Sequence, residues 1–209
     1  MCYTFAILTT AELTLMPTTA TQLMTIDEFF VWQQGHEDRY ELVEGVPVKL
    51  MTGASEVHDV VVTNVLAALH GQLRGKPCRS HTADLAVRTK IRSLRRADVL
   101  VTCDNDPPRR DSYAARNPRL IVEVLSPSNS GAPWQQKLEE YRRGAGLCYI
   151  LLVDTKVEQA VFIRRSGETW EHDDFYGREG MIELPEIGCR LAMADVYDGV
   201  AMPKSDIET

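Results

Sequence analysis

Three short runs of aliphatic residues constrain the fold of this chain more than any other feature. They lie at residues 96–103, 119–125 and 148–154, and their polar residues do not alternate regularly with the apolar ones. Near-continuous runs of Val, Leu and Ile are typical of central strands that are covered on both faces. We therefore expect a layered fold in which these strands form the middle of a sheet.

The segments that precede the first run predict two helices and a hairpin. Thr25 begins a Thr-Ile-Asp-Glu segment with the spacing of a capping box, so a short helix is expected to begin there. Two extended segments flank Glu44-Gly45 and predict a β-hairpin, and Pro47 indicates that its second strand lies at a sheet edge. Apolar residues recur every four positions over residues 56–73, which predicts a long amphipathic helix.

The remaining segments alternate between strand and helix patterns. The expected elements are a strand at 83–88, a polar loop at 104–118, a helix at 135–143, a closing hairpin at 157–164 and 169–175, and an irregular C-terminal part. This interleaving predicts the α/β class with a mixed sheet. We expect one domain over residues 25–200, a flexible leader at 1–24 and a frayed tail at 201–209.

The charge of the chain limits how it could bind nucleic acid. The net charge is −7 in 209 residues, so such binding must rest on local basic patches. For any single arginine pair, a solvated surface is the simpler interpretation. The candidate patches are Arg92, Arg95 and Arg96; Arg109 and Arg110; Arg142 and Arg143; and Arg164 and Arg165.

The spacing of the cysteines and the length of the apolar segments indicate in which cellular compartment the chain resides. The five cysteines are widely spaced and form no CxxC pair or zinc-ligand pattern. Because their number is odd, a disulfide framework is not expected. The natural interpretation is free, mostly buried thiols in a reducing cytoplasm. No apolar run is long enough to span a membrane, so a membrane partner is not expected either.

Two acidic residues stand in apolar company. Asp98 lies within the first aliphatic run, and Glu123 interrupts the second. A buried carboxylate is costly unless it is paired or bound to a metal. Two such acids on adjacent strands would suit Mg²⁺ or Mn²⁺, which prefer carboxylate oxygens. The alternative for each acid is a strand end, where it meets solvent or an arginine.

Three further residues could take part in the same chemistry. Lys137 follows on the next helix with Tyr141 on the same face, and a lysine near a metal-bound water can orient the nucleophile. His58 lies in the first turn of the long helix, where the helix dipole favours its neutral form. Glu41 points away from its apolar neighbours and faces either solvent or a site. A plain surface position is the alternative for each of the three.

Five short motifs occur in an order that resembles a known family. They are Tyr40-Glu-Leu-Val-Glu-Gly, Gly53-Ala-Ser-Glu-Val-His58, Ala97-Asp98-Val, Val122-Glu-Val-Leu-Ser-Pro-Ser128 and Lys137-Leu-Glu-Glu-Tyr141-Arg. In these motifs the chain resembles the Uma2 family of endonucleases, within the PD-(D/E)xK nuclease superfamily. The resemblance covers residues 25–191, and it implies a restriction-endonuclease-like core with a mixed β-sheet flanked by helices.

The resemblance also implies roles for single residues. Asp98 matches the metal-binding aspartate of the family, although Ala97 stands where proline is usual. Glu123 matches the second acidic ligand. Leu125 occupies the position where the superfamily pattern has a lysine, and Lys137 on the following helix matches a lysine that has moved there.

Glu41 and His58 match acidic and histidine positions that recur in the family. Together these matches imply an endonuclease that depends on Mg²⁺ or Mn²⁺ and hydrolyses phosphodiester bonds of nucleic acid, with DNA as the expected substrate. Asp98 and Glu123 are the expected metal ligands, with Glu41 and the Val124 carbonyl as further candidates. The alternatives are a non-catalytic nucleic-acid-binding or assembly module that keeps the nuclease fold, and a phosphoesterase acting on small nucleotides. The family and the exposed edge hairpin also suggest a homodimer.

Overall fold

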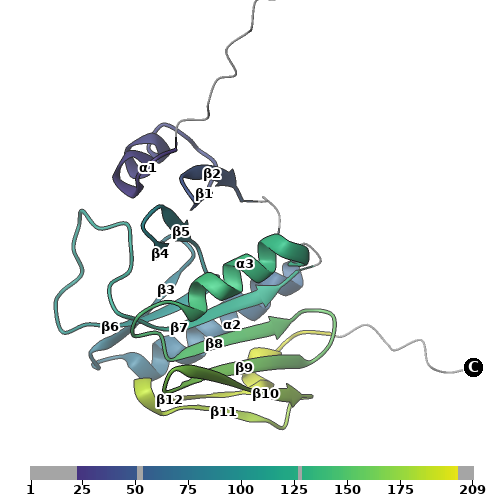
Figure 1. The fold of residues 1–209 in the computed structure, drawn as a ribbon. Coiled ribbons are helices and arrows are strands. Elements are labelled where there is room, and N and C mark those ends of the chain that lie inside the picture. Colours follow the sequence, from purple (N-terminus) through teal and green to yellow (C-terminus); the bar gives the residue numbers. More distant parts are fainter. Residues whose placement is uncertain (1–22, 51–53, 127–128, 202–209) are drawn as a thin grey trace, which may run out of the picture.

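A six-stranded sheet forms the centre of the molecule, and a four-stranded sheet lies beside it (Figure 1). The computed structural model describes residues 23–50, 54–126 and 129–201. The elements follow the chain in this order: α1 (Ile26–Gln33), β1 (Tyr40–Val43), β2 (Val46–Lys49), α2 (Glu56–Leu73), β3 (Cys78–Thr82), β4 (Val87–Lys90), β5 (Ser93–Arg95), β6 (Val99–Cys103), β7 (Pro118–Leu125), α3 (Gly131–Arg142), β8 (Tyr149–Asp154), β9 (Gln159–Ser166), β10 (Thr169–Tyr176), β11 (Met181–Leu184), the short 3₁₀ helix η1 (Pro185–Ile187), β12 (Cys189–Ala192) and α4 (Met193–Val196).

The large sheet is mixed, as the sequence predicts. Its order is β10-β9-β8-β7-β6-β3, in which β7 and β8 are parallel and the other neighbours are antiparallel. Two parallel neighbours need a crossover connection. Here α3 forms that connection, and it places Lys137 over β7.

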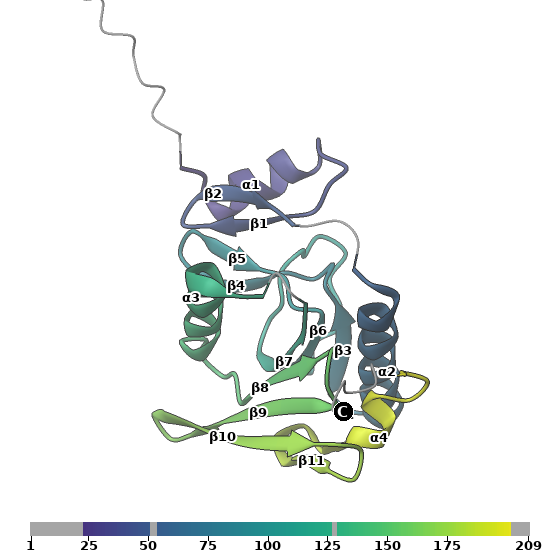
Figure 2. The same cartoon turned by 90° about the vertical axis from the view of Figure 1, so that its right-hand side faces the viewer.

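Helices cover both faces of the large sheet (Figure 2). The predicted helix at 56–73 is confirmed as α2, and its buried residues Val61, Val65 and Leu69 pack against one face. On the other face α3 contributes Tyr141 to a second buried cluster. Because strand residues alternate between faces, β7 directs Val122 toward α2 and its neighbours in sequence toward α3.

The small sheet has the order β2-β1-β5-β4, with α1 packed on it. The predicted hairpin is confirmed. Glu44 and Gly45 both have positive φ at its turn, which is the geometry of a type I′ turn. A Cβ on Gly45 would lie 2.9 Å from Cβ of Leu23, so the site requires glycine. β2 is the edge strand that Pro47 predicts.

Two sequence predictions about strands were wrong in whole or in part. The expected strand at 83–88 is right only at its end: residues 83–85 turn the chain after β3, Ala86 forms an isolated bridge with Ala114, and β4 begins at Val87. The C-terminal part is not irregular, because β11, β12 and α4 form a compact layer against α2. The buried side chains of this layer include Ile182, Leu184, Ile187, Leu191, Met193 and Tyr197.

The prediction of free cysteines was also wrong for one pair. Cys78 on β3 and Cys103 on β6 are register partners and form a disulfide. The sequence did not reveal the pairing because β3 was not recognised as a strand. Cys148 and Cys189 are free thiols. With this disulfide, the cysteines no longer indicate a reducing compartment.

The predicted leader and tail fall mostly outside the described residues. Of the leader at 1–24, only residues 23 and 24 are described, and of the tail at 201–209 only residue 201. Met24 donates its N–H to the carbonyl of Gly45 at 2.8 Å, so the last leader residue is bound to the small sheet. In the described part of the chain, no helix has the length and apolar character to cross a membrane.

Candidate active site

The five predicted site residues come from separate parts of the chain and gather between α2 and α3. They are Glu41 on β1, His58 in the first turn of α2, Asp98 directly before β6, Glu123 on β7 and Lys137 on α3. Figure 2 shows how the small sheet and the two helices surround this region. The contacts among these side chains define the candidate site.

Lys137 points into the protein. Its Nζ donates to Glu123, at 2.9 Å from Oε1 and 3.1 Å from Oε2, and lies 3.2 Å from Oε1 of Glu41. It also donates to the carbonyl of Arg96 at 3.1 Å. Only 13% of the side chain is exposed. The ammonium group is therefore held between two carboxylates beneath α3.

Glu123 is buried because it lies on the face of β7 that α3 covers. Its Oε1 accepts a hydrogen bond of 2.6 Å from the hydroxyl of Tyr141. Lys137 and Tyr141 are four residues apart on α3, so both reach Glu123 from one helix face. Both carboxylate oxygens of Glu123 thus have a donor within the protein.

Asp98 and His58 form the more open side of the site. Oδ2 of Asp98 accepts from the N–H of Val124 at 2.8 Å and lies 3.6 Å from Nε2 of His58. The side chains of His58 and Asp98 are 15% and 24% exposed. Ser55 caps α2 by accepting from the N–H of His58, which fixes the helix turn that presents the imidazole.

Glu41 faces the site and not solvent. Its Oε1 accepts from the N–H of Arg96 at 2.8 Å, and its Oε2 accepts from Nη1 of Arg95 at 3.0 Å. Together with Lys137, these contacts surround the carboxylate with donors. Glu41 therefore serves as a fixed partner for cations of the protein itself.

Burial and neighbouring charges shift the acid–base properties of these groups. Burial raises the pKa of Glu123 to about 7, and the charge of Asp98 adds to the rise, while Lys137 and Tyr141 oppose it. Burial acts to lower the pKa of Lys137, but the carboxylates of Glu123 and Glu41 outweigh it and raise that pKa. The lysine is therefore a cation at neutral pH.

The pKa of His58 corrects an expectation drawn from the helix dipole. The carboxylate of Asp98 raises this pKa above its ordinary value, against the smaller opposing effect of burial. The helix dipole alone predicts a neutral imidazole, whereas the carboxylate of Asp98 favours the protonated form more strongly.

Sequence reasoning missed two residues of the site. Arg95, 5% exposed, makes a bidentate pair with Glu140, 1% exposed. Arg95 was assigned to a surface patch, and Glu140 was not singled out. A usable signal existed for Glu140, because it lies three residues after Lys137 and is therefore its neighbour on the surface of α3.

The donor chemistry of the site fits a divalent cation. Asp98 and Glu123 offer carboxylate oxygens, which Mg²⁺ and Mn²⁺ prefer, and the charge of Asp98 adds to the cost of ionising Glu123. A cation between them would relieve that repulsion. Within the described ranges, no three Asp, Glu, His or Cys side chains form a ready metal cage. The remaining ligands would be waters, backbone oxygens or substrate phosphates, as is common for Mg²⁺.

The sheet is mixed, and the α3 crossover between the parallel strands β7 and β8 places Lys137 over Glu123 of β7. This arrangement is the restriction-endonuclease-like nuclease fold. A crystal structure from Anabaena variabilis, described as a putative nuclease belonging to DUF820, has this fold with a TM-score of 0.65. The match covers 83% of this chain and 97% of that chain at 16% identity. The chain belongs to the Uma2 family, whose model, described as "Putative restriction endonuclease", matches residues 26–194.

Two Synechocystis proteins, both described as uncharacterized, are similar along most of their length. The protein slr1290 is 27% identical over 177 residues, which are 84% of this chain and 92% of that protein. The protein sll1609 is 25% identical over 174 residues, which are 81% and 97% of the two chains. The chain therefore spans nearly the whole length of these relatives.

Proposed function

We propose that this protein is a metal-dependent endonuclease that hydrolyses phosphodiester bonds of nucleic acid, with DNA as the substrate. The observation that carries the proposal is the inward position of Lys137, whose ammonium contacts Glu123 beside Asp98. A buried lysine next to two neighbouring acids suits a reaction in which negative charge develops on a phosphate.

The proposed roles follow from the contacts. Asp98 and Glu123 would hold Mg²⁺ or Mn²⁺, which supplies Lewis acidity for the phosphate and lowers the pKa of the attacking water. Lys137 orients that water and offsets charge in the transition state. Tyr141 keeps Glu123 turned toward the site. Glu41 holds Lys137 in place.

The exposed fractions of the side chains indicate where the substrate enters. Exposure falls from Asp98 at 24% and His58 at 15% to Glu123 at 4%. A phosphate would therefore approach from the side of Asp98 and His58, with Glu123 as the deepest group. A protonated His58 at this entrance can donate a hydrogen bond to a phosphate oxygen.

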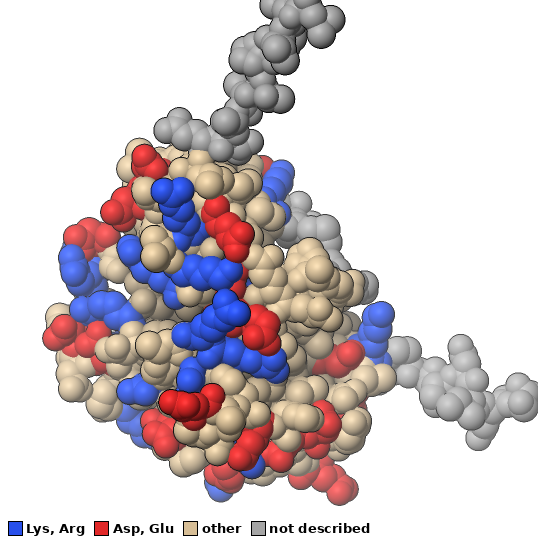
Figure 3. Space-filling model, in the orientation of Figure 1, with Lys and Arg blue, Asp and Glu red and all other residues tan. Residues whose placement is uncertain are grey.

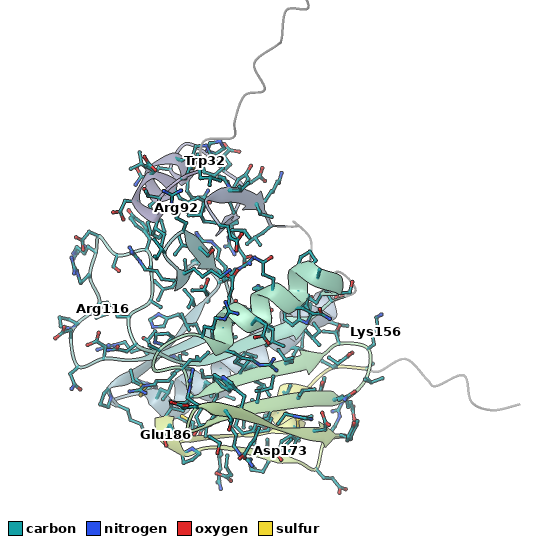
Figure 4. All side chains as sticks on the ribbon, viewed as in Figure 1. Trp32, Arg92, Arg116, Lys156, Asp173 and Glu186 are labelled. Atoms are coloured by element: carbon teal, nitrogen blue, oxygen red, sulfur yellow. A yellow bond between two sulfur atoms is a disulfide. The ribbon has the colours of Figure 1, made fainter. Side chains whose placement is uncertain are left out.

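Metal-dependent nicking of supercoiled plasmid tests the proposal. We expect nicking with Mg²⁺ or Mn²⁺, none with chelator, and loss of activity in Asp98→Asn and Lys137→Met. The matched control is Glu186→Gln, because this exposed acid lies at the end of the molecule away from α1 (Figure 4). Equal activity in all four proteins would overturn the assignment.

A binding or assembly module with a nuclease fold is the rival, and calorimetry distinguishes it. The nuclease requires Mn²⁺ binding that Asp98→Asn and Glu123→Gln weaken. A folded protein that binds no Mn²⁺, alone or with DNA, would favour the rival. The same titration with Glu186→Gln shows whether any loss is specific to the site.

A further inference from the structure

Arg95 lies where the small sheet meets α3. Its Nε donates to Oε2 of Glu140 at 2.8 Å, and its Nη2 donates to Oε1 at 3.0 Å. Its Nη1 donates to Oε2 of Glu41 at 3.0 Å. The side chains of all three residues are 6% exposed or less. One buried guanidinium thus joins a strand of the small sheet to the helix that carries Lys137.

The pair with Glu140 fixes the rotation of α3 about its own axis. Two parallel hydrogen bonds between a planar guanidinium and a planar carboxylate set an angle as well as a distance. Glu140 also accepts from Thr89 at 2.8 Å and from Gln136 at 3.2 Å. Lys137 lies three residues before Glu140 on α3, so this rotation also sets the direction of Lys137 and of the adjacent Tyr141, both of which contact Glu123.

The contact with Glu41 acts on the ammonium group itself. Glu41 is clamped between Arg95 and the N–H of Arg96, which leaves its Oε1 at 3.2 Å from Nζ of Lys137. Lys137 therefore contacts a second fixed carboxylate in addition to Glu123. Without Arg95, Glu41 would lose one of its donors and its fixed orientation.

We propose that Arg95 is a positioning residue that orients Lys137 toward Glu123, through Glu140 on one side and Glu41 on the other. This inference rests on the proposed nuclease function, since it assigns Lys137 a part in the reaction. Arg95 acts through its neighbours, because its side chain is 6% exposed and its guanidinium contacts Glu140 and Glu41. The small sheet thereby completes the site of the large one.

The charge-balanced variant Arg95→Met/Glu140→Met tests the proposal by removing both partners of the bidentate pair, and it also takes one donor from Glu41. Buried ion pairs can often be replaced by apolar side chains without loss of stability, so we expect this variant to fold. We expect kcat for plasmid nicking to fall by about 10- to 100-fold, as when groups that orient metal-site ligands are removed. KM should stay unchanged, because substrate binding does not involve Arg95.

A second variant, Arg95→Lys, separates charge from orientation. It keeps the positive charge but cannot form the bidentate contact. We therefore expect it to lose kcat as well. The matched control is Arg165→Met, which removes hydrogen bonds of 2.9 Å to the carbonyls of Arg142 and Gly144 at the end of α3. Unfolding in urea checks that the control and the Arg95 variants are equally stable. The control should then keep the kcat of the wild type, and a fall in its kcat equal to that of the Arg95 variants would overturn the proposal.

Amine labelling followed by mass spectrometry tests the position of Lys137 without any activity. Lys137 should label slowly in the wild type and faster in Arg95→Met/Glu140→Met, while Lys49, which is 53% exposed, stays constant. Unchanged labelling of Lys137 would overturn the proposal. A wild type that nicks no plasmid, with Lys137 labelling that still responds to Arg95, would refute the nuclease function and leave the positioning contact standing.

Discussion

His58 and Asp98 form a titratable pair that reports on metal binding. Asp98 raises the pKa of His58 above 6.5. We expect NMR titration to show this raised value in the metal-free protein and a lower one in Asp98→Asn. Saturating Mg²⁺ should also lower it, because the ion would draw the charge of Asp98 away from the imidazole. The exposed His36 is the control. A pKa of His58 that does not change when Mg²⁺ is added would contradict metal binding at Asp98.

The same pair links stability to pH with a definite sign. Since the folded-state pKa of His58 is raised, its contribution to stability is complete below pH 6.5 and is lost as pH rises through the raised value. Asp98→Asn should therefore cost more stability in urea at about pH 6 than at about pH 9. Equal costs at the two values would show that His58 and Asp98 do not interact.

Tyr141→Phe tests how Glu123 is kept ionised. Removing the hydroxyl removes a donor that opposes the rise in the pKa of Glu123, so that pKa should move further above 7. Mn²⁺ binding should then weaken more at about pH 6 than at about pH 9, where Glu123 is ionised anyway. Calorimetry at both values measures this, with a stability cost of about 1 kcal/mol for the lost hydrogen bond. Tyr176→Phe, at a side chain 68% exposed, should change neither quantity.

At the scale of elements, those with a strong local pattern were predictable. The helix over 56–73 has the observed bounds because its apolar stripe runs from one capping signal to the next. β7 and β8 were recognised because both are buried on two faces. β3 was missed, because its Cys-Arg-Ser-His-Thr sequence is half-buried and carries no apolar period.

Contacts that join distant parts of the chain were beyond sequence reasoning. Asp98 and Glu123 were singled out as acids within aliphatic runs, and the family motifs joined them to Lys137, Glu41 and His58 as one predicted site. Glu140 lies within one of these motifs, but nothing in the sequence joins it to Arg95, since the two residues lie on α3 and β5 and meet only when the small sheet packs against the helix. The C-terminal elements were not predicted for a related reason. Each of β11, β12 and α4 has only four residues, and its burial depends on packing against α2.

Leu191→Ala tests whether the C-terminal elements belong to the core. Leu191 on β12 is fully buried in the cluster that includes α2. We expect a loss of about 2–5 kcal/mol in the free energy of unfolding, from lost burial and the cavity left behind. The control Ile91→Ala, at a side chain 92% exposed, should stay within about 0.5 kcal/mol. A cost below about 1 kcal/mol for Leu191→Ala would show that this layer adds little to the fold.

At the scale of the whole molecule, charge decides how a polyanion could be bound. The net charge is −7, yet Lys and Arg side chains gather in a band across the middle of one face (Figure 3). Several of the arginines expected in basic patches are engaged within the protein. Arg95 and Arg96 belong to the site network, Arg165 caps the end of α3, and Arg164 pairs with Glu171.

Three arginines remain as candidates for phosphate contact. In the described part of the chain, no ion pair joins Arg92, Arg110 or Arg143 to a carboxylate. Figure 4 shows Arg92 beside α1, near the small sheet that contributes Glu41 and Arg95 to the site. An arginine that forms no ion pair within the protein can neutralise a phosphate without first breaking such a pair.

The salt dependence of DNA binding tests this selection. In an Asp98→Asn background, which prevents cleavage, we expect the logarithm of the affinity to fall linearly with the logarithm of salt concentration. Each arginine that contacts a phosphate contributes about 0.9 to the slope, so Arg92→Gln/Arg110→Gln/Arg143→Gln should bind more weakly with a shallower slope. Arg164→Gln is the matched control, because its guanidinium already pairs with Glu171 and Asp173. Fluorescence anisotropy with labelled duplex DNA measures both, and a triple variant with the slope of the control would mean that other residues contact the phosphates.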